Sequence, residues 1–146
     1  MLPVLPELSR AASPPRDEEI HVTLDPAATA DFAGTFAGTA LRPGDPGFAE
    51  ARAAAVWNGA ITRQPGLIVQ PTSNEQVAAA IAFVRDQGAE LTVRGGGHGF
   101  AGNTVADGAV MIDLSPVSAV RVDPAARRAY VGGGASLAML DAATAE

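Results

Sequence analysis

Cysteine is absent from the 146-residue sequence, and lysine is absent too, so all ten basic residues are arginines. The lack of thiols excludes disulfides, thiolate zinc sites and cysteine nucleophiles within the chain. The lack of lysine argues against a Walker-type phosphate loop, which needs that side chain. Acidic residues outnumber basic ones and give a net charge of −6. Because no cluster of basic residues is present, we expect no nucleic-acid partner.

Long apolar runs are missing as well. No stretch approaches the roughly 20 residues that a helix needs to span a bilayer. The amino terminus has neither the basic start nor the sustained apolar run of a secretory signal. We therefore expect no membrane partner and a cytoplasmic location. The sequence is 47% hydrophobic and 18% charged, a balance typical of a folded protein with one core.

Prolines and glycines divide the chain into three parts. Residues 1–24 are rich in proline and carry an acidic run, which indicates an irregular leader. Residues 25–59 are a lead-in of two short helices, one capped by Asp25 and one over residues 48–56, with a proline- and glycine-rich turn between them. Trp57 follows the second helix, and we expect its ring in the core. Residues 60–146 contain the clearest pattern of strands and helices.

Residues 67–69 and 91–93 are short apolar runs that predict two buried strands. A helix is predicted between them, ended by Gly88. Its start can be capped by Ser73 with Gln76 or by Thr72 with Glu75. Residues at the spacing i, i+3, i+4 and i+7 lie on one face of a helix, and here we expect them to be buried: Val77, Ala80, Ile81 and Val84. A strand, a helix and a strand at this spacing form a βαβ crossover, which implies two parallel strands.

Further strands are predicted over residues 110–114, 119–122 and 128–131, and the last two form a hairpin. Ser136 is suited to cap a final helix. The sequence ends inside that helix without a stop signal, so we expect a truncated product. The fold class that follows is α+β, with a βαβ unit joined to a mixed sheet.

A glycine-rich loop after the second strand carries the most distinctive chemistry. It reads Arg94-Gly95-Gly96-Gly97-His98-Gly99, with Gly102 and Asn103 shortly after. Glycines remove the Cβ atoms that keep a ligand from the main chain, and successive N–H groups at a strand end can bind pyrophosphate oxygens. Arg94 adds a positive charge, and His98 is the only good nucleophile in the loop. His21 is the only other histidine, so a histidine metal site is not expected.

Gly97, Gly99 and Gly102 also match the spacing of the dinucleotide fingerprint of Rossmann proteins. That fingerprint requires a helix whose amino terminus meets the phosphates. Residues 103–108 offer no amphipathic helix before the next strand. A nicotinamide-dependent Rossmann dehydrogenase is therefore the weaker alternative.

Residues 65–136 resemble the FAD-binding domain of the vanillyl-alcohol oxidase and p-cresol methylhydroxylase (PCMH) type, and within it the berberine-bridge-enzyme-like and 6-hydroxynicotine-oxidase-like flavoproteins. The resemblance rests on residues 67–71, the capped helix, residues 93–98, residues 101–103 and residues 112–115. It implies FAD as cofactor, with a covalent bond from His98 to the C8 methyl carbon of the flavin. The residues that it implies at the cofactor are Arg94, Gly95, Gly96, Gly97, His98, Gly99, Gly102, Asn103, Asp113, Leu114 and Ser115.

The resemblance further implies an incomplete PCMH-type FAD-binding domain over residues 60–146, whose intact parent oxidises a small organic substrate such as an alcohol, amine or sugar. No catalytic residue is expected in this chain, because the family places its catalytic base further along. Gly99 departs from the family, which usually carries Ser or Asn there. The competing hypothesis is a truncated, catalytically silent remnant that binds flavin. Gly132, Gly133 and Gly134 form either a plain turn or a second phosphate-binding helix start.

Overall fold

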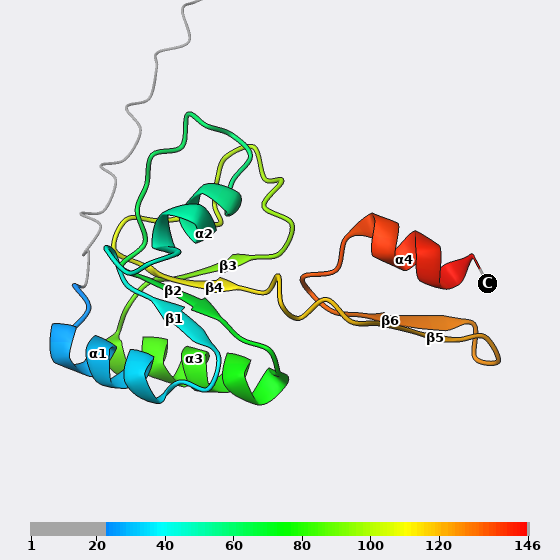
Figure 1. Ribbon diagram of the computed structural model, residues 1–146, viewed down its shortest axis with the longest axis horizontal. Helices are drawn as coiled ribbons and strands as arrows, with labels where there is room; N and C mark the ends of the chain where they lie inside the picture. Colours follow the sequence, from blue (N-terminus) through cyan, green and yellow to red (C-terminus); the bar gives the residue numbers. More distant parts are fainter. Residues whose placement is uncertain (1–22, 146) are drawn as a thin grey trace, which may run out of the picture.

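The computed structural model describes residues 23–145, which form a four-stranded sheet with helices on both faces and, beside it, a hairpin with one helix (Figure 1). Of the predicted leader, only Thr23 and Leu24 fall within the described residues. The elements follow one another as α1 (Pro26–Thr35), β1 (Thr39–Leu41), α2 (Phe48–Ala54), β2 (Leu67–Gln70), α3 (Asn74–Gln87), β3 (Leu91–Arg94), β4 (Val110–Asp113), β5 (Val120–Asp123), β6 (Arg128–Val131) and α4 (Leu137–Thr144).

The sheet has the strand order β1-β2-β4-β3. Strands β2, β4 and β3 are parallel, whereas β1 pairs with β2 in the antiparallel direction. The predicted parallel βαβ unit is confirmed, with one difference: β4 lies between the two strands that α3 connects. The α+β class with a mixed sheet is confirmed as well. Parallel strands end at the same edge of a sheet, so β2, β3 and β4 bring their carboxyl ends together.

The two faces of the sheet bury separate apolar clusters. On one face, α1 and α3 cover residues of β2 and β4, and the rings of Phe32 and Phe83 stack with centroids 4.3 Å apart. On the other face, α2 and the β3–β4 loop cover Ile68 and Met111. Both faces of β2 and β4 are therefore covered, which explains why these strands are apolar without alternation.

Local sequence signals explain where the helices begin and end. Asp25 caps α1 by accepting a hydrogen bond from the Ala28 N–H at 2.7 Å, and Ser73 caps α3 by accepting from the Gln76 N–H. The structure uses a mixture of the two predicted boxes, because the Gln76 side chain reaches back to the N–H of Thr72. Gly88 ends α3 at a φ of +60°, a conformation that glycine adopts without strain.

Part of the predicted helical face is wrong. Ala80 and Val84 are buried, but Ile81 is 47% exposed. The cluster beneath α3 consists of residues from β2 and β4, while Leu91 and Val93 of β3 are 37% and 48% exposed. The helices on this face therefore leave the β3 edge uncovered, and a side chain on that flank of α3 has nothing to bury it.

Strands β5 and β6 form the predicted antiparallel hairpin, and α4 begins after Ser136, which accepts a hydrogen bond from the Met139 N–H. The hairpin and α4 lie beside the sheet and do not extend it (Figure 1). No residue of these three elements, all of which the structure describes, is buried. None of the helices in residues 23–145 has the length and apolar character needed to cross a membrane.

Candidate functional site

The residues predicted to meet a cofactor lie at one end of the sheet. The glycine-rich loop leaves the carboxyl end of β3, and residues 113–115 follow from the carboxyl end of β4. These two strand ends are neighbours, because Arg94 of β3 pairs in register with Asp113 of β4. Ligands of sheets with parallel strands commonly bind outside the carboxyl ends of those strands. The topology therefore supports this edge as the candidate site.

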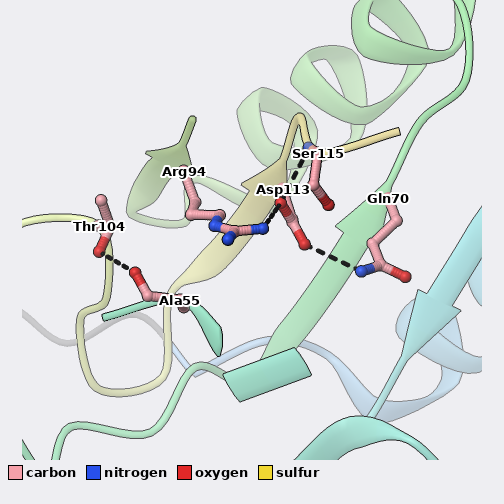
Figure 2. A network of polar contacts seen from close by, with 6 residues as sticks. All are labelled: Ala55, Gln70, Arg94, Thr104, Asp113 and Ser115. Atoms are coloured by element: carbon pink, nitrogen blue, oxygen red, sulfur yellow. Dashed lines mark hydrogen bonds and ion pairs between the residues drawn. The ribbon is translucent and has the colours of Figure 1, made fainter. Parts of the chain in front are cut away.

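Asp113 is the centre of the polar network at this edge (Figure 2). Its carboxylate forms an ion pair with Nη1 of Arg94 at 2.8 Å, and it accepts hydrogen bonds from Nε2 of Gln70 and the Ser115 N–H. The Asp113 side chain is almost fully buried, and that of Arg94 is 16% exposed. Gln70 was not among the predicted site residues, although its position at the end of a buried parallel strand is a signal that could have identified it.

The network keeps Asp113 ionised. Burial alone raises the pKa of this carboxyl group, because the charged form loses its hydration. The hydrogen bonds from Gln70, Arg94 and Ser115 outweigh burial and hold the pKa of Asp113 below its ordinary value. The charge of Arg94 is balanced by this carboxylate. The sequence predicted that Arg94 adds a positive charge to the loop, whereas in the structure this charge is paired with Asp113.

The glycine-rich loop presents main-chain N–H groups instead. In the part of the chain that the structure describes, the N–H groups of residues 95–101 donate no hydrogen bond. Most of these residues are exposed, including His98, Gly99 and Phe100. A row of N–H groups without an intramolecular acceptor at a strand end is a site that anionic oxygen atoms can occupy. This arrangement fits the pyrophosphate of FAD.

The structure requires glycine at some positions of the loop and not at others. A Cβ at Gly97 would lie 2.7 Å from the Ala55 carbonyl oxygen, and a Cβ at Gly102 would lie 2.8 Å from the side chain of Ile61; both glycines have positive φ. Packing of the chain itself therefore requires glycine at these two positions. Gly99 is different, because a Cβ there would meet no atom within 4 Å. A side chain at position 99, as in the family pattern, would fit.

His98 lies at the exposed middle of this loop. A Cβ built at Gly96 would lie 2.7 Å from Nδ1 of His98, so the imidazole ring lies over Gly96. The His98 carbonyl oxygen accepts a hydrogen bond from Nε1 of Trp57 at 3.0 Å. Trp57 is 61% exposed, and the expectation that its ring lies in the core is wrong. Its indole N–H binds the loop at the surface instead.

The two glycine runs of the sequence meet at this edge. A Cβ at Gly95 would lie 2.9 Å from the carbonyl oxygen of Gly133, and a Cβ at Gly134 would overlap the carbonyl oxygen of Leu114. The turn at residues 132–134 therefore packs against the ends of β3 and β4. Asn103 and Ser115 lie in the segments that follow these strands. Within residues 23–145, no group of three or more histidine, aspartate and glutamate side chains could hold a metal ion.

After Gly102 the chain continues as a loop until β4 begins, and no helix starts there. The phosphate-binding helix start that a Rossmann fingerprint requires is thus missing from this segment, as the sequence predicted. The Rossmann alternative receives no support from the fold.

Comparison with known proteins identifies the family of the chain. Residues 65–146 match the family described as FAD binding domain. The chain is 35% identical over 97 residues to (R)-6-hydroxynicotine oxidase of Paenarthrobacter nicotinovorans, covering 66% of this chain and 21% of that protein. It is 37% identical over 78 residues to berberine bridge enzyme-like D-1 of Nicotiana tabacum, covering 51% of this chain and 14% of that protein.

Solved structures show the same likeness. The crystal structure of 6-hydroxy-D-nicotine oxidase from Arthrobacter nicotinovorans superimposes with a TM-score of 0.71 at 32% identity, over 76% of this chain and 24% of that one. Wild-type BBE-like 1 of Physcomitrella patens gives a TM-score of 0.65 at 25% identity, over 73% of this chain and 23% of that one. The chain thus spans about a quarter or less of the length of these relatives. It belongs to the family of PCMH-type FAD-binding domains found in 6-hydroxynicotine oxidase and the berberine-bridge-enzyme-like proteins.

Proposed function

We propose that this chain holds the FAD of an oxidoreductase that takes electrons from a small organic substrate such as an alcohol, amine or sugar. The observation that carries the proposal is the exposed glycine-rich loop, whose N–H groups at residues 95–101 have no acceptor among the described residues. Pyrophosphate oxygens are suitable acceptors for such groups. The names of the relatives, an oxidase and FAD-linked oxidoreductases among them, support the reaction class.

The charges at the site indicate which groups attract the cofactor. Arg94 and Asp113 neutralise each other, so the attraction for the cofactor phosphates comes mainly from main-chain dipoles. Gly102, Asn103, Leu114 and Ser115 belong to the segments beside the loop and complete the cofactor residues that we propose. Bound FAD supplies the two-electron chemistry, while the protein supplies its orientation and surroundings.

We further propose that FAD is attached covalently through His98. Support comes from the exposure of His98 in the middle of the loop and from its position over Gly96, which leaves room for the imidazole. Attachment forms a bond between an imidazole nitrogen and the C8 methyl carbon of the flavin. One hydrogen from the methyl group and one from the imidazole N–H are lost with two electrons, and dioxygen accepts both hydrogens and both electrons to give hydrogen peroxide. The histidine must be neutral to form this bond.

The test is the intact mass of the protein under denaturing acid. We expect the mass of the polypeptide plus FAD, with the adduct lost in the variant His98→Ala. The matched control is His21→Ala, which removes the other histidine of the sequence and should keep the adduct. An adduct that persists in His98→Ala would contradict attachment at this residue.

Absorbance spectra and turnover separate the remaining possibilities. Flavin absorbance that co-purifies with the chain but is released by acid would support FAD binding and contradict the covalent link. A preparation that binds a nicotinamide cofactor and no flavin would contradict the whole proposal. Flavin that is bound but reduced by no alcohol, amine or sugar would limit the function to flavin binding, which is the remnant hypothesis.

A further inference from the structure

The segment before β2 holds the glycine-rich loop by hydrogen bonds to its carbonyl groups. We call residues 55–63 the lead-in segment, a name that from here on means this range only and not the longer lead-in predicted over residues 25–59. Nε1 of Trp57 donates to the His98 carbonyl oxygen at 3.0 Å, and Nδ2 of Asn58 donates to that of Phe100 at 3.2 Å. Nη2 of Arg63 donates to the carbonyl oxygen of Ala101 at 2.7 Å. Three side chains thus fix the main chain at His98 and just beyond it.

The lead-in segment is itself fixed to α2. Nε of Arg52 donates to the carbonyl oxygen of Arg63 at 2.9 Å, and its Nη2 donates to that of Ile61 at 2.6 Å. Asn58 also folds back on its own turn, because its Oδ1 accepts from the Ala60 N–H. The donors that hold the loop are therefore attached to a helix that packs on the sheet. They fix the position of the loop relative to the sheet.

Close packing reinforces these bonds on both sides of His98. Gly97 approaches the carbonyl oxygen of Ala55, and Gly102 approaches the side chain of Ile61. Thr104 donates a hydrogen bond to the same Ala55 carbonyl oxygen at 2.9 Å (Figure 2). The rings of Trp57 and Phe100 lie 6.2 Å apart, which adds an aromatic contact between the two segments. Side chains of the lead-in segment thus donate hydrogen bonds to the carbonyl groups of residues 98, 100 and 101. The N–H groups of residues 95–101 have no acceptor among the described residues.

We propose that Trp57, Asn58 and Arg63 are positioning residues for the covalent attachment of flavin to His98. The inference rests on the proposed function, because it needs FAD to be bound and attached there. A loop so rich in glycine has many accessible conformations. Bond formation requires the reacting atoms to be held close and aligned, and a small displacement slows such a step strongly. Fixing the carbonyl of His98 and those of residues 100 and 101 limits where the imidazole can point.

Affinity for FAD and the rate of attachment should depend on different parts of the loop. The N–H groups of residues 95–97 follow directly from β3, whose end is held by the ion pair between Arg94 and Asp113. We expect these groups to remain in place when the lead-in donors are removed. His98 and the residues after it are held by the lead-in segment. Loss of a lead-in donor is therefore expected to slow attachment more than it weakens binding.

The experiment compares the whole 146-residue chain with variants that each lose one donor, namely Trp57→Phe, Asn58→Asp and Arg63→Gln. Asn58→Asp is nearly isosteric and keeps the oxygen that accepts from Ala60. The dissociation constant for FAD is measured by quenching of flavin fluorescence directly after mixing. The attachment rate is measured by intact mass in acid-quenched samples. The melting temperature of each variant reports its folding.

We expect each lost bond to slow attachment about tenfold, the change that corresponds to roughly 1.4 kcal/mol in a barrier. The FAD dissociation constant should rise by a clearly smaller factor than the attachment rate falls, and the melting temperature should change little. Arg63→Lys keeps a donor of the same charge and should restore much of the rate lost in Arg63→Gln. Arg85→Gln is the matched control, because Arg85 is exposed on α3 and its side chain bonds only to its neighbour Asp86 among the described residues. This variant should attach FAD at the unaltered rate.

Unaltered attachment rates in all three variants would overturn the inference while leaving the proposed function intact. Rates that fall only in step with FAD affinity or melting temperature would also overturn it, because that pattern indicates a purely structural role. If the unaltered chain binds FAD without attaching it, the covalent proposal and this inference both fail. If the unaltered chain binds no FAD at all, the proposed function itself fails, and the binding measurement shows this before any variant is compared.

Discussion

Strands β4 and β6 have the same length and similar apolar content, yet their surroundings differ completely. All four residues of β4 are buried, whereas all four of β6 are exposed. β4 has a partner strand on each side and covered faces above and below, while β6 has one partner strand and α4 nearby. Burial is therefore set by the number of neighbours, and the stability of the chain is expected to reside in the sheet and its helices.

The hairpin region shows what such a lack of neighbours leaves open. An open groove of about 1050 Å³ lies between the hairpin and α4, lined in part by Val120, Val122 and Met139. Tyr130, Val131 and Leu137 are 48%, 47% and 77% exposed. The turn at residues 132–134 connects this region to the sheet by close main-chain contacts with Gly95 and Leu114. The region is thus fixed at its base and has little core of its own.

The largest expected effect is the loss of a core side chain from the sheet. Ile112→Ala removes a buried side chain of β4 from the apolar cluster beneath α3 and should lower the free energy of unfolding by about 4 kcal/mol. The measurement is urea unfolding followed by circular dichroism. A loss below about 1 kcal/mol would show that the sheet is no better packed than the hairpin.

The second effect is electrostatic and depends on pH. Asp113→Asn leaves the largely buried Arg94 without its carboxylate and should cost about 3 kcal/mol at neutral pH. Because the pKa of Asp113 is lower in the folded than in the unfolded chain, its contribution is present above the unfolded pKa of about 3.9 and is lost as the pH falls through the folded pKa.

Unfolding free energies at a series of pH values test this dependence. The difference between Asp113→Asn and the unaltered chain should shrink toward acid pH. The matched control in the other region is Asp123→Asn. Among the described residues, the Asp123 side chain accepts one hydrogen bond, from the Ala126 N–H in the exposed hairpin turn, and the variant should change stability by less than about 1 kcal/mol. A constant difference at all pH values for Asp113→Asn would contradict the role of its charge.

A smaller effect is expected within the glycine-rich loop. Gly97→Ala places a Cβ against the Ala55 carbonyl oxygen at a φ of +70° and should cost about 2 kcal/mol. Gly99→Ser meets open space and should leave the melting temperature within the error of the measurement. Calorimetry of the two variants side by side tests the difference. Equal losses would mean that the loop does not pack against the lead-in segment as described.

The smallest effect is expected in the hairpin. Tyr130→Ala removes a ring that Arg121 covers with its guanidinium carbon 4.0 Å from the ring centroid. Both partners are exposed, and such contacts contribute about 0.5–1 kcal/mol. Urea unfolding should show a change within that range. A loss as large as that of Ile112→Ala would break the comparison between the two regions, because it would give the hairpin a core that its exposure does not indicate.

The same contrast explains what the sequence could predict. Each strand of the βαβ unit and each cap has a local cause, such as the apolar run of β2, the hydroxyl of Ser73 or the position of Gly88, so these elements were predicted close to their observed bounds. The insertion of β4 between β2 and β3 has no local cause. It depends on pairing between residues far apart in the chain, and neither periodicity nor turn chemistry carries that information.

The site was predicted in part for the same reason. The glycine-rich loop was recognised from its residues, whereas residues 113–115 were placed beside it only because the family resemblance implied that both line the same cofactor. The ion pair of Arg94 with Asp113 depends on the register between β3 and β4, which the sequence did not reveal. Trp57 was assigned to the core because large aromatic side chains usually contribute there. Its exposed position reflects one hydrogen bond to a carbonyl group of another segment, and no spacing pattern signals such a bond.

The position of β4 also has a consequence for how the chain folds. β2 and β3 are joined through α3, but no hydrogen bonds connect them directly, because β4 occupies the place between them. Until residues 110–113 have been synthesised, the facing edges of both strands lack their partner. The sheet therefore closes late, when one short strand completes two ladders together. We infer that its formation is cooperative, and that the entropy of closing the loop of residues 95–109 contributes to the folding barrier.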